Sequence, residues 1–214
     1  MTTLETIEKY KLVAICRGVE SKDIPALCDA LLKGGIHLVE ITFDHSSKDG
    51  FSNTLKCINT INDNYQGMLI VGAGTVLSVE EVSAAAEAGA TYIISPNTDP
   101  DVIRNTKDLG LVSIPGAMTP TEAETAVKAG ADLVKLFPAA ALGTEYFKSI
   151  MSPLKHIRFV PTGGITPENM KEFLELGAVG FGIGGNLINA KQVKDGRFDL
   201  IEAVARAFCQ AAGL

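Results

Sequence analysis

The run AGADLVKLFP, residues 129–138, joins a helix-to-strand turn to a short apolar strand. Glycine suits the turn, because it adopts the left-handed conformation that ends many helices. The segment Leu133–Pro138 is apolar at most successive positions, which is typical of a strand buried on both faces in a parallel sheet. Lys135 is the exception in this strand, since a lysine is seldom fully buried without a partner.

The same unit recurs along the chain as a β-rich run, a turn rich in Gly, Pro, Thr or Asn, and an amphipathic helix. Ser78–Glu81 and Thr119–Glu122 have the pattern of capping boxes, and Thr166–Glu168 places proline at the first helical position. A further helix is predicted over Thr3–Tyr10. The predicted strands are Leu12–Gly18, His37–Phe43, Met68–Thr75, Tyr92–Pro96, Leu111–Met118, Leu133–Pro138, Arg158–Ile165 and Gly180–Ile188.

Eight such units in 214 residues predict an α/β protein, a single (β/α)8 TIM barrel with an extra N-terminal helix. We expect one domain over residues 1–214. A doubly wound open sheet is the alternative. A doubly wound nucleotide-binding sheet usually has a glycine-rich fingerprint after its first strand, and the segment Cys16–Glu20 does not have one.

The composition narrows the class of protein. The net charge of −6 does not indicate binding to nucleic acid or to a membrane surface, and no apolar run of about 18 residues predicts a membrane span. The polar N-terminus is unlike a signal peptide, and the four cysteines form no CxxC motif, so we expect a cytoplasmic protein with reduced thiols. The three histidines are dispersed, so we expect no metal. We also expect no cofactor.

Active sites of TIM barrels lie at the C-terminal ends of the strands. Side chains alternate between the two faces along Leu38–Thr42 and Leu133–Phe137. If the neighbours Val39, Ile41, Val134 and Leu136 face the helices, Glu40 and Lys135 both point into the barrel. Two interpretations remain open. The two residues form a structural ion pair, or Lys135 is a neutral nucleophile that forms a Schiff base while Glu40 transfers protons.

Glycine turns follow the last two predicted strands, at Thr162–Ile165 and Gly184–Asn186. Many barrel enzymes bind phosphate at this place through backbone N–H groups. The two motifs together predict a phosphate site, although glycine also serves ordinary turns. The motif Gly72–Thr75 indicates either close approach of the backbone to a ligand or a tight strand-to-helix turn.

These motifs, in this order, resemble the 2-keto-3-deoxy-6-phosphogluconate (KDPG) and 4-hydroxy-2-oxoglutarate (KHG) aldolase family. The resemblance extends from the first strand to the last helix. Members of that family are metal-free class I aldolases, homotrimeric barrels that cleave KDPG to pyruvate and glyceraldehyde 3-phosphate. The segments that carry the resemblance are Val39–Thr42, Gly72–Val76, Ser95–Pro96, Val134–Ala139, Pro161–Ile165 and Gly184–Gly185.

The resemblance assigns a role to each matching residue. It implies that Lys135 forms the Schiff base, that Glu40 is the general acid and base, and that Thr75 holds the pyruvyl carboxylate. Pro96 and Thr162 would also contact the substrate, with Thr162 influencing stereochemical choice. The residues implied to bind phosphate are Gly163, Gly164, Gly184, Gly185 and Asn186.

The chain departs from the family pattern at three positions. Asp44 stands where the gluconate-type enzymes supply an arginine for the substrate carboxylate, and an aspartate cannot replace it at neutral pH. We expect Arg17, at the end of the first strand, to take that role. Asn97 stands where glycine is common and is closer to the galactonate-type relatives, while Thr162 favours the gluconate type. Asn186 stands where a serine often contacts phosphate.

The expected reaction is cleavage of KDPG to pyruvate and glyceraldehyde 3-phosphate, and of 4-hydroxy-2-oxoglutarate to pyruvate and glyoxylate. The alternatives are the 6-phosphogalactonate-specific aldolase, a phosphosugar epimerase or isomerase on the same barrel, and a barrel that binds phosphate ligands without turnover. The expected partners are a small-molecule substrate and two further copies of the chain.

Overall fold

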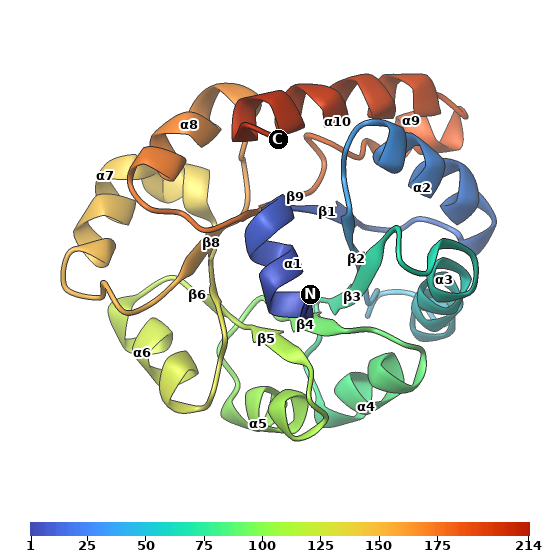
Figure 1. Cartoon of the computed structure of the whole chain (residues 1–214). Helices are drawn as coiled ribbons and strands as arrows, with labels where there is room; N and C mark the ends of the chain where they lie inside the picture. The colour runs from blue at the N-terminus through green and yellow to red at the C-terminus, as the bar shows by residue number, and fades with distance from the viewer.

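The computed structural model describes residues 1–214, and Figure 1 shows a ring of strands enclosed by helices. The strands are β1 (Leu12–Cys16), β2 (Leu38–Thr42), β3 (Ile70–Gly74), β4 (Tyr92–Ile94), β5 (Val112–Ile114), β6 (Gly116–Ala117), β7 (Val134–Leu136), β8 (Phe159–Pro161) and β9 (Phe181–Ile183). The helices are α1 (Thr3–Tyr10), α2 (Ile24–Lys33), α3 (Gly50–Tyr65), α4 (Val79–Glu87), α5 (Pro100–Asp108), α6 (Pro120–Lys128), α7 (Ala139–Met151), α8 (Pro167–Glu175), α9 (Ala190–Lys194) and α10 (Phe198–Ala212).

The strands are parallel and close into a barrel, which confirms the predicted TIM barrel and excludes the open sheet. One sheet has the order β5-β4-β3-β2-β1-β9, and the other has the order β6-β7-β8. A bridge between Thr162 and Gly182 joins β8 to β9. The predicted strand Leu111–Met118 is divided into β5 and β6 at Pro115, because proline has no N–H to donate to a ladder. The eight predicted strand positions are therefore all present.

Helix α1 lies across the N-terminal opening of the ring (Figure 1). Its Ile7 is buried in a cluster with the inward side chains Val13, Leu38, Tyr92 and Val160. The predicted N-terminal helix is thus confirmed, and it closes the end of the barrel opposite the C-terminal ends of the strands.

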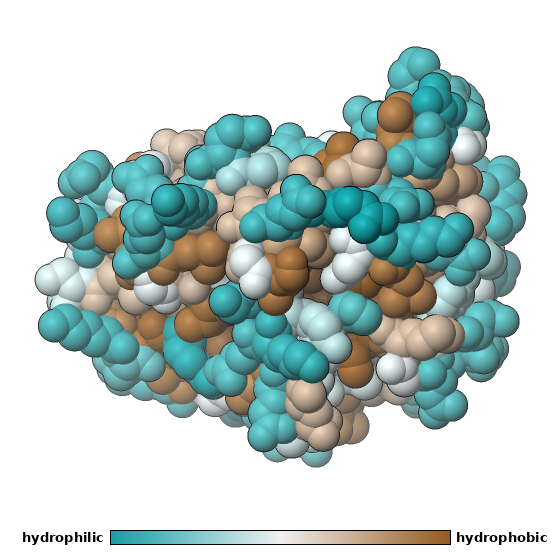
Figure 2. Space-filling view, turned by 45° about the horizontal axis from the view of Figure 1, so that its top comes forward, coloured by the Kyte–Doolittle hydropathy of each residue, from teal (hydrophilic) through white to brown (hydrophobic).

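A larger core lies between the strands and the outer helices. Helix α10 packs against α2 and α8, so the last helix completes the outer ring next to the first β/α unit. On the face shown in Figure 2, hydrophilic side chains form most of the raised surface and hydrophobic residues are visible mainly between them. None of the helices is long and apolar enough to cross a membrane.

The predicted helix starts agree with the structure, with one difference. The Thr119 capping box is complete, and Pro167 stands at the start of α8. At α4 only half of the predicted capping box forms. The Ser78 hydroxyl accepts a hydrogen bond from the Glu81 N–H, but the Glu81 carboxylate accepts none from the Ser78 N–H. That carboxylate bonds to Leu77 N–H and to His45 instead.

Candidate active site

Lys135 points into the barrel from β7. Its neighbours Val134 and Leu136 belong to the core under the helices, as alternation predicted, while Leu133 belongs to the inner cluster. The Lys135 residue is 8% exposed, and its Nζ lies 5.1 Å from the centroid of the Phe137 ring. Burial lowers the pKa of the Lys135 amine, and the charge of Arg17 lowers it further, whereas the Glu40 carboxylate opposes the shift.

Glu40 points into the barrel from β2. Val39 and Ile41 on either side of it face the helices, and Glu40 is 1% exposed. Its Oε2 has no hydrogen-bond partner. Burial raises the pKa of the Glu40 carboxyl, and the charges of Lys135 and Arg17 partly offset that rise.

No ion pair joins Glu40 to Lys135, and neither side chain hydrogen-bonds to another protein group. The interpretation as a closed structural ion pair is therefore wrong. Burial favours the neutral form of both groups, and a neutral amine is the nucleophilic form of lysine. A carboxyl group with a raised pKa suits proton transfer near neutral pH.

Two glycines on β3 make room for the inward side chains of neighbouring strands. A Cβ added to Gly74 would collide with Glu40 Oε1, and one added to Gly72 would collide with the Tyr92 ring. Tyr92 donates a hydrogen bond of 2.7 Å to the Val39 carbonyl, beside Glu40 in the sequence. In the motif Gly72–Thr75, Gly74 therefore leaves the space that Glu40 occupies, and Gly72 leaves the space that Tyr92 occupies. Tyr92 was not predicted as part of the site, although alternation along β4 places it on the inner face.

Thr75 follows β3 with a backbone φ of 55°, in the left-handed region. A β-branched residue is rarely found there, and such residues persist where the surroundings hold them. Thr75 also lines the cavity described next. Held backbone strain at a cavity wall is typical of a functional position.

A cavity of about 880 Å³ opens at the C-terminal ends of the strands. It brings together every residue that the sequence predicted for the site: Arg17, Glu40, Thr75, Pro96, Lys135, Thr162, Gly163, Gly164, Gly184, Gly185 and Asn186. Its remaining lining residues, to which the sequence assigned no individual role, are Ile15, Phe137, Ile165, Gly182, Ile188, Asn189 and Ala190. Phe137 shares a strand face with Lys135, as alternation along Leu133–Phe137 indicated.

The glycine turns at one side of the cavity carry free donors. The backbone N–H groups of Gly164, Gly184, Gly185 and Asn186 donate to no protein acceptor. The Asn186 side chain donates to the Ile165 carbonyl at 2.7 Å, so it joins the two turns and has one amide hydrogen left. A Cβ on Gly184 or Gly185 would meet nothing within 4 Å, so the space beside them is open. Clustered free N–H groups of this kind bind anions such as phosphate.

Arg17 supplies positive charge to the cavity. It is exposed at the end of β1 and forms no ion pair or hydrogen bond with the protein. Its charge acts on both Glu40 and Lys135. Asp44 does not line this cavity but a second hollow of about 480 Å³, where it accepts hydrogen bonds from the Ser46 N–H and hydroxyl.

The residues present favour covalent chemistry on a small anionic carbonyl compound. The cavity has one buried amine, one buried carboxyl group, a free guanidinium and a set of free N–H donors. Nowhere do three or more His, Cys, Asp or Glu side chains come together in a way that could hold a metal ion.

Comparison with known proteins agrees with this arrangement. The family model described as "Aldolase: KDPG and KHG aldolase" matches residues 4–204. The chain belongs to this family. It is accordingly a class I aldolase, a lyase, as the resemblance implied.

Curated relatives of this aldolase carry different substrate names. A 2-dehydro-3-deoxy-6-phosphogalactonate aldolase of Escherichia coli (strain K12) is 34% identical over 95% of this chain and 97% of its own. A 2-dehydro-3-deoxy-phosphogluconate aldolase of Treponema pallidum is 32% identical over 100% of this chain and 99% of its own. These relatives show the family, but their similar identities do not decide between the two sugar acids as substrate.

Solved structures of this family superpose over nearly the whole aldolase chain. A structure described as native KDPGal has a TM-score of 0.85 at 35% identity and covers 94% of this chain and 93% of its own. The KDPG aldolase of Legionella pneumophila has a TM-score of 0.86 at 25% identity, with 97% and 98% covered. That enzyme was captured with pyruvate as a covalent carbinolamine intermediate.

Proposed function

We propose that this aldolase cleaves KDPG to pyruvate and glyceraldehyde 3-phosphate, and 4-hydroxy-2-oxoglutarate to pyruvate and glyoxylate. The observation that carries the proposal is the buried, unpaired Lys135 amine opposite the unpaired Glu40 carboxyl in one cavity. The pyruvate adduct of the Legionella relative supports the same chemistry.

In the proposed reaction, the neutral amine of Lys135 adds to the C2 ketone and forms a carbinolamine. Glu40, in its protonated form, donates a proton to the C2 hydroxyl, which leaves as water and gives an iminium ion. The Glu40 carboxylate then takes the proton of the C4 hydroxyl. The electrons of the C3–C4 bond pass into the iminium as the aldehyde product departs.

The product left on Lys135 is an enamine. Glu40 returns its proton to C3, which regenerates an iminium ion. Water then adds to C2 of this iminium ion and gives up a proton to the Glu40 carboxylate, and the resulting carbinolamine releases pyruvate and the neutral Lys135 amine. One carboxyl group therefore alternates between acid and base without net change over the cycle. The raised pKa of Glu40 supports this double role, because burial makes its acid form more accessible than that of an exposed glutamate.

The two ends of the substrate are anionic, and the cavity offers two places for them. We assign the phosphate to the turns at Gly163, Gly164, Gly184 and Gly185, with Asn186 beside them, because four N–H groups there lack acceptors. We assign the carboxylate to Thr75 and Arg17, because the charge of Arg17 reaches both reacting groups. Pro96 and Thr162 also line the cavity.

The galactonate-type substrate is the second candidate, because one relative with that name is 34% identical over nearly its full length. Initial rates with KDPG and with its C4 epimer, measured by coupled detection of pyruvate, test the assignment. A kcat/KM higher for KDPG supports our proposal, and one higher for the epimer replaces it with the second candidate. No pyruvate from either compound would contradict both.

The family resemblance also implies a trimer, which we propose for this chain and which light scattering after gel filtration tests. A trimer mass is expected, and a monomer mass contradicts it. The four free cysteines agree with a cytoplasmic location, where thiols stay reduced.

A further inference from the structure

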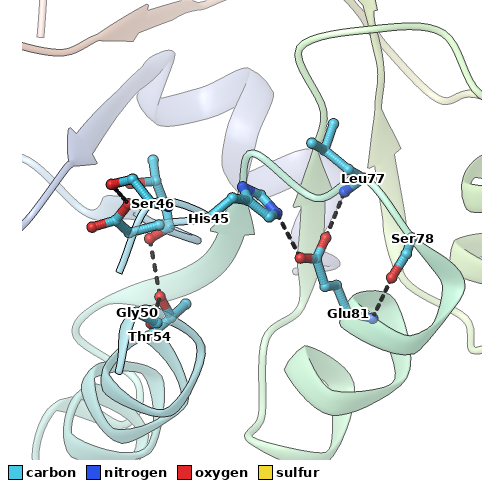
Figure 3. Close-up of polar contacts among 9 residues, drawn as sticks. His45, Ser46, Gly50, Thr54, Leu77, Ser78 and Glu81 are labelled. Atoms are coloured by element: carbon cyan, nitrogen blue, oxygen red, sulfur yellow. Dashed lines mark hydrogen bonds and ion pairs between the residues drawn. The ribbon is translucent and has the colours of Figure 1, made fainter. Parts of the chain in front are cut away.

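His45, on the loop after β2, bonds to Glu81, in the first turn of α4, at the mouth of the barrel (Figure 3). His45 Nε2 lies 2.6 Å from Glu81 Oε1, and the Glu81 side chain is 10% exposed. The other oxygen of Glu81 accepts the Leu77 N–H at 2.6 Å. We call these two contacts the Glu81 clasp.

The Glu81 clasp lies beyond the point where the backbone pairing of β2 and β3 stops. The register ends with Thr42 opposite Gly74, and the last backbone bond runs from Phe43 N–H to the Gly74 carbonyl. Residues 43–49 then turn toward α3, and residues 75–78 turn toward α4. The bond between His45 and Glu81 is the only hydrogen bond between residues 43–49 and residues 75–81, and Glu81, in the first turn of α4, connects it to Leu77.

The clasp is not an ordinary cap of helix α4. A capping-box glutamate at this position bonds to the N–H of the N-cap residue, which is Ser78. The Glu81 carboxylate bonds instead to Leu77, one residue outside the cap, and to a loop from another β/α unit. Its bonds therefore hold the loops in place as well as the helix.

These bonds stabilise the backbone turn that contains Thr75, two positions before Leu77. Its left-handed backbone needs support from both sides of the turn. Gly74 precedes it in β3, Val76 N–H bonds to the Ile94 carbonyl at 3.3 Å, and Leu77 N–H bonds to Glu81. Without the Glu81 carboxylate, the Leu77 N–H on the C-terminal side of this turn loses its acceptor.

We propose that Glu81 and His45 are positioning residues for substrate binding, which hold Thr75 in the conformation that receives the pyruvyl carboxylate. The inference rests on the proposed role of Thr75. Neither Glu81 nor His45 lines the cavity, so both act through the loop and not on the substrate itself.

The test uses pyruvate as the probe and borohydride trapping on the full-length protein as the readout. Trapping rates over a range of pyruvate concentrations give a half-saturating concentration and a limiting rate. Glu81→Ala should raise the half-saturating concentration about tenfold, the effect of one lost charge-assisted hydrogen bond, while the limiting rate changes less than about threefold. His45 is exposed, so His45→Ala should leave the fold intact. This variant should also raise the half-saturating concentration of pyruvate, by a smaller factor than Glu81→Ala.

Two further variants separate positioning from general destabilisation. Glu81→Gln should bind pyruvate within about threefold of wild type, because its amide oxygen still accepts the Leu77 N–H. Ser78→Ala removes the helix cap and should lower the melting temperature without changing the half-saturating concentration.

The outcomes are distinct. An unchanged half-saturating concentration of pyruvate in Glu81→Ala and His45→Ala overturns the inference. A rise in Ser78→Ala equal to that in Glu81→Ala overturns it too, as does a rise in Glu81→Gln equal to that in Glu81→Ala. Failure of the wild-type protein to trap pyruvate at any concentration overturns the proposed function instead.

Discussion

The carboxyl group of Glu40 fills the space that a side chain on residue 74 would need, since a Cβ on Gly74 would collide with Glu40 Oε1. Gly74 does not have a positive φ, so alanine fits its backbone and the effect of a substitution comes from the collision. Gly74→Ala should displace Glu40 and lower turnover by about 10²-fold or more, as expected when a general acid–base group is lost.

Glu40→Gln provides the comparison for that variant. It should lose turnover to a similar degree, about 10²–10⁴-fold, while pyruvate trapping at Lys135 stays detectable. Steady-state rates and circular dichroism of both variants check this. A folded Gly74→Ala protein with wild-type turnover would show that Glu40 does not need its observed position.

The pH dependence of trapping should respond in opposite directions to two substitutions. Burial lowers the pKa of Lys135, the Glu40 charge raises it and the Arg17 charge lowers it. Trapping requires the neutral amine, so its rate falls as the pH drops through the pKa of Lys135. Glu40→Gln removes a negative charge and should move this acidic limb to lower pH, whereas Arg17→Ala should move it to higher pH. Limbs that move together would contradict the electrostatic account.

Arg17 should contribute to pyruvate binding, because pyruvate has a carboxylate and no phosphate. A charge-assisted hydrogen bond is worth ~1.5–3 kcal/mol, or about 10–150-fold in affinity. Arg17→Ala should lose most of that factor and Arg17→Lys part of it, since an ammonium cannot make the bidentate contact. Saturation of trapping by pyruvate measures the effect. If only phosphorylated substrates bind more weakly, Arg17 serves the phosphate end.

The phosphate site should be sensitive to charge at Gly185. Its φ is not positive and a Cβ there meets nothing within 4 Å, so both alanine and aspartate fit the backbone. Gly185→Asp should raise KM for the phosphorylated substrate much more than for 4-hydroxy-2-oxoglutarate, because the carboxylate repels the anion. Gly185→Ala should have a much smaller effect. Equal losses on both substrates with Gly185→Asp would assign the turn a purely structural role.

Much of the fold could be predicted because each β/α unit has local start and stop motifs in its own sequence. The division at Pro115 also has a local cause, the missing N–H of proline, although the prediction ran a single strand through it. Alternation placed Glu40 and Lys135 on inner faces, and the strand ends supplied the other predicted site residues.

The contacts that sequence analysis missed depend on pairs of residues from different units. Gly72 faces Tyr92 and Gly74 faces Glu40, and neither pairing is visible before the strand register is known. Glu81 was predicted to cap its own helix, which is a local rule, but His45 is 36 residues away and competes for its carboxylate. Tertiary contacts decided these positions.

The most direct test of the central claim is mass spectrometry of the protein after treatment with pyruvate and borohydride. Lys135 is the buried amine without a partner, so we expect one pyruvyl-derived addition, located on a peptide that contains Lys135 and absent from Lys135→Ala. Modification of a different lysine, or full aldolase activity in Lys135→Ala, would contradict it.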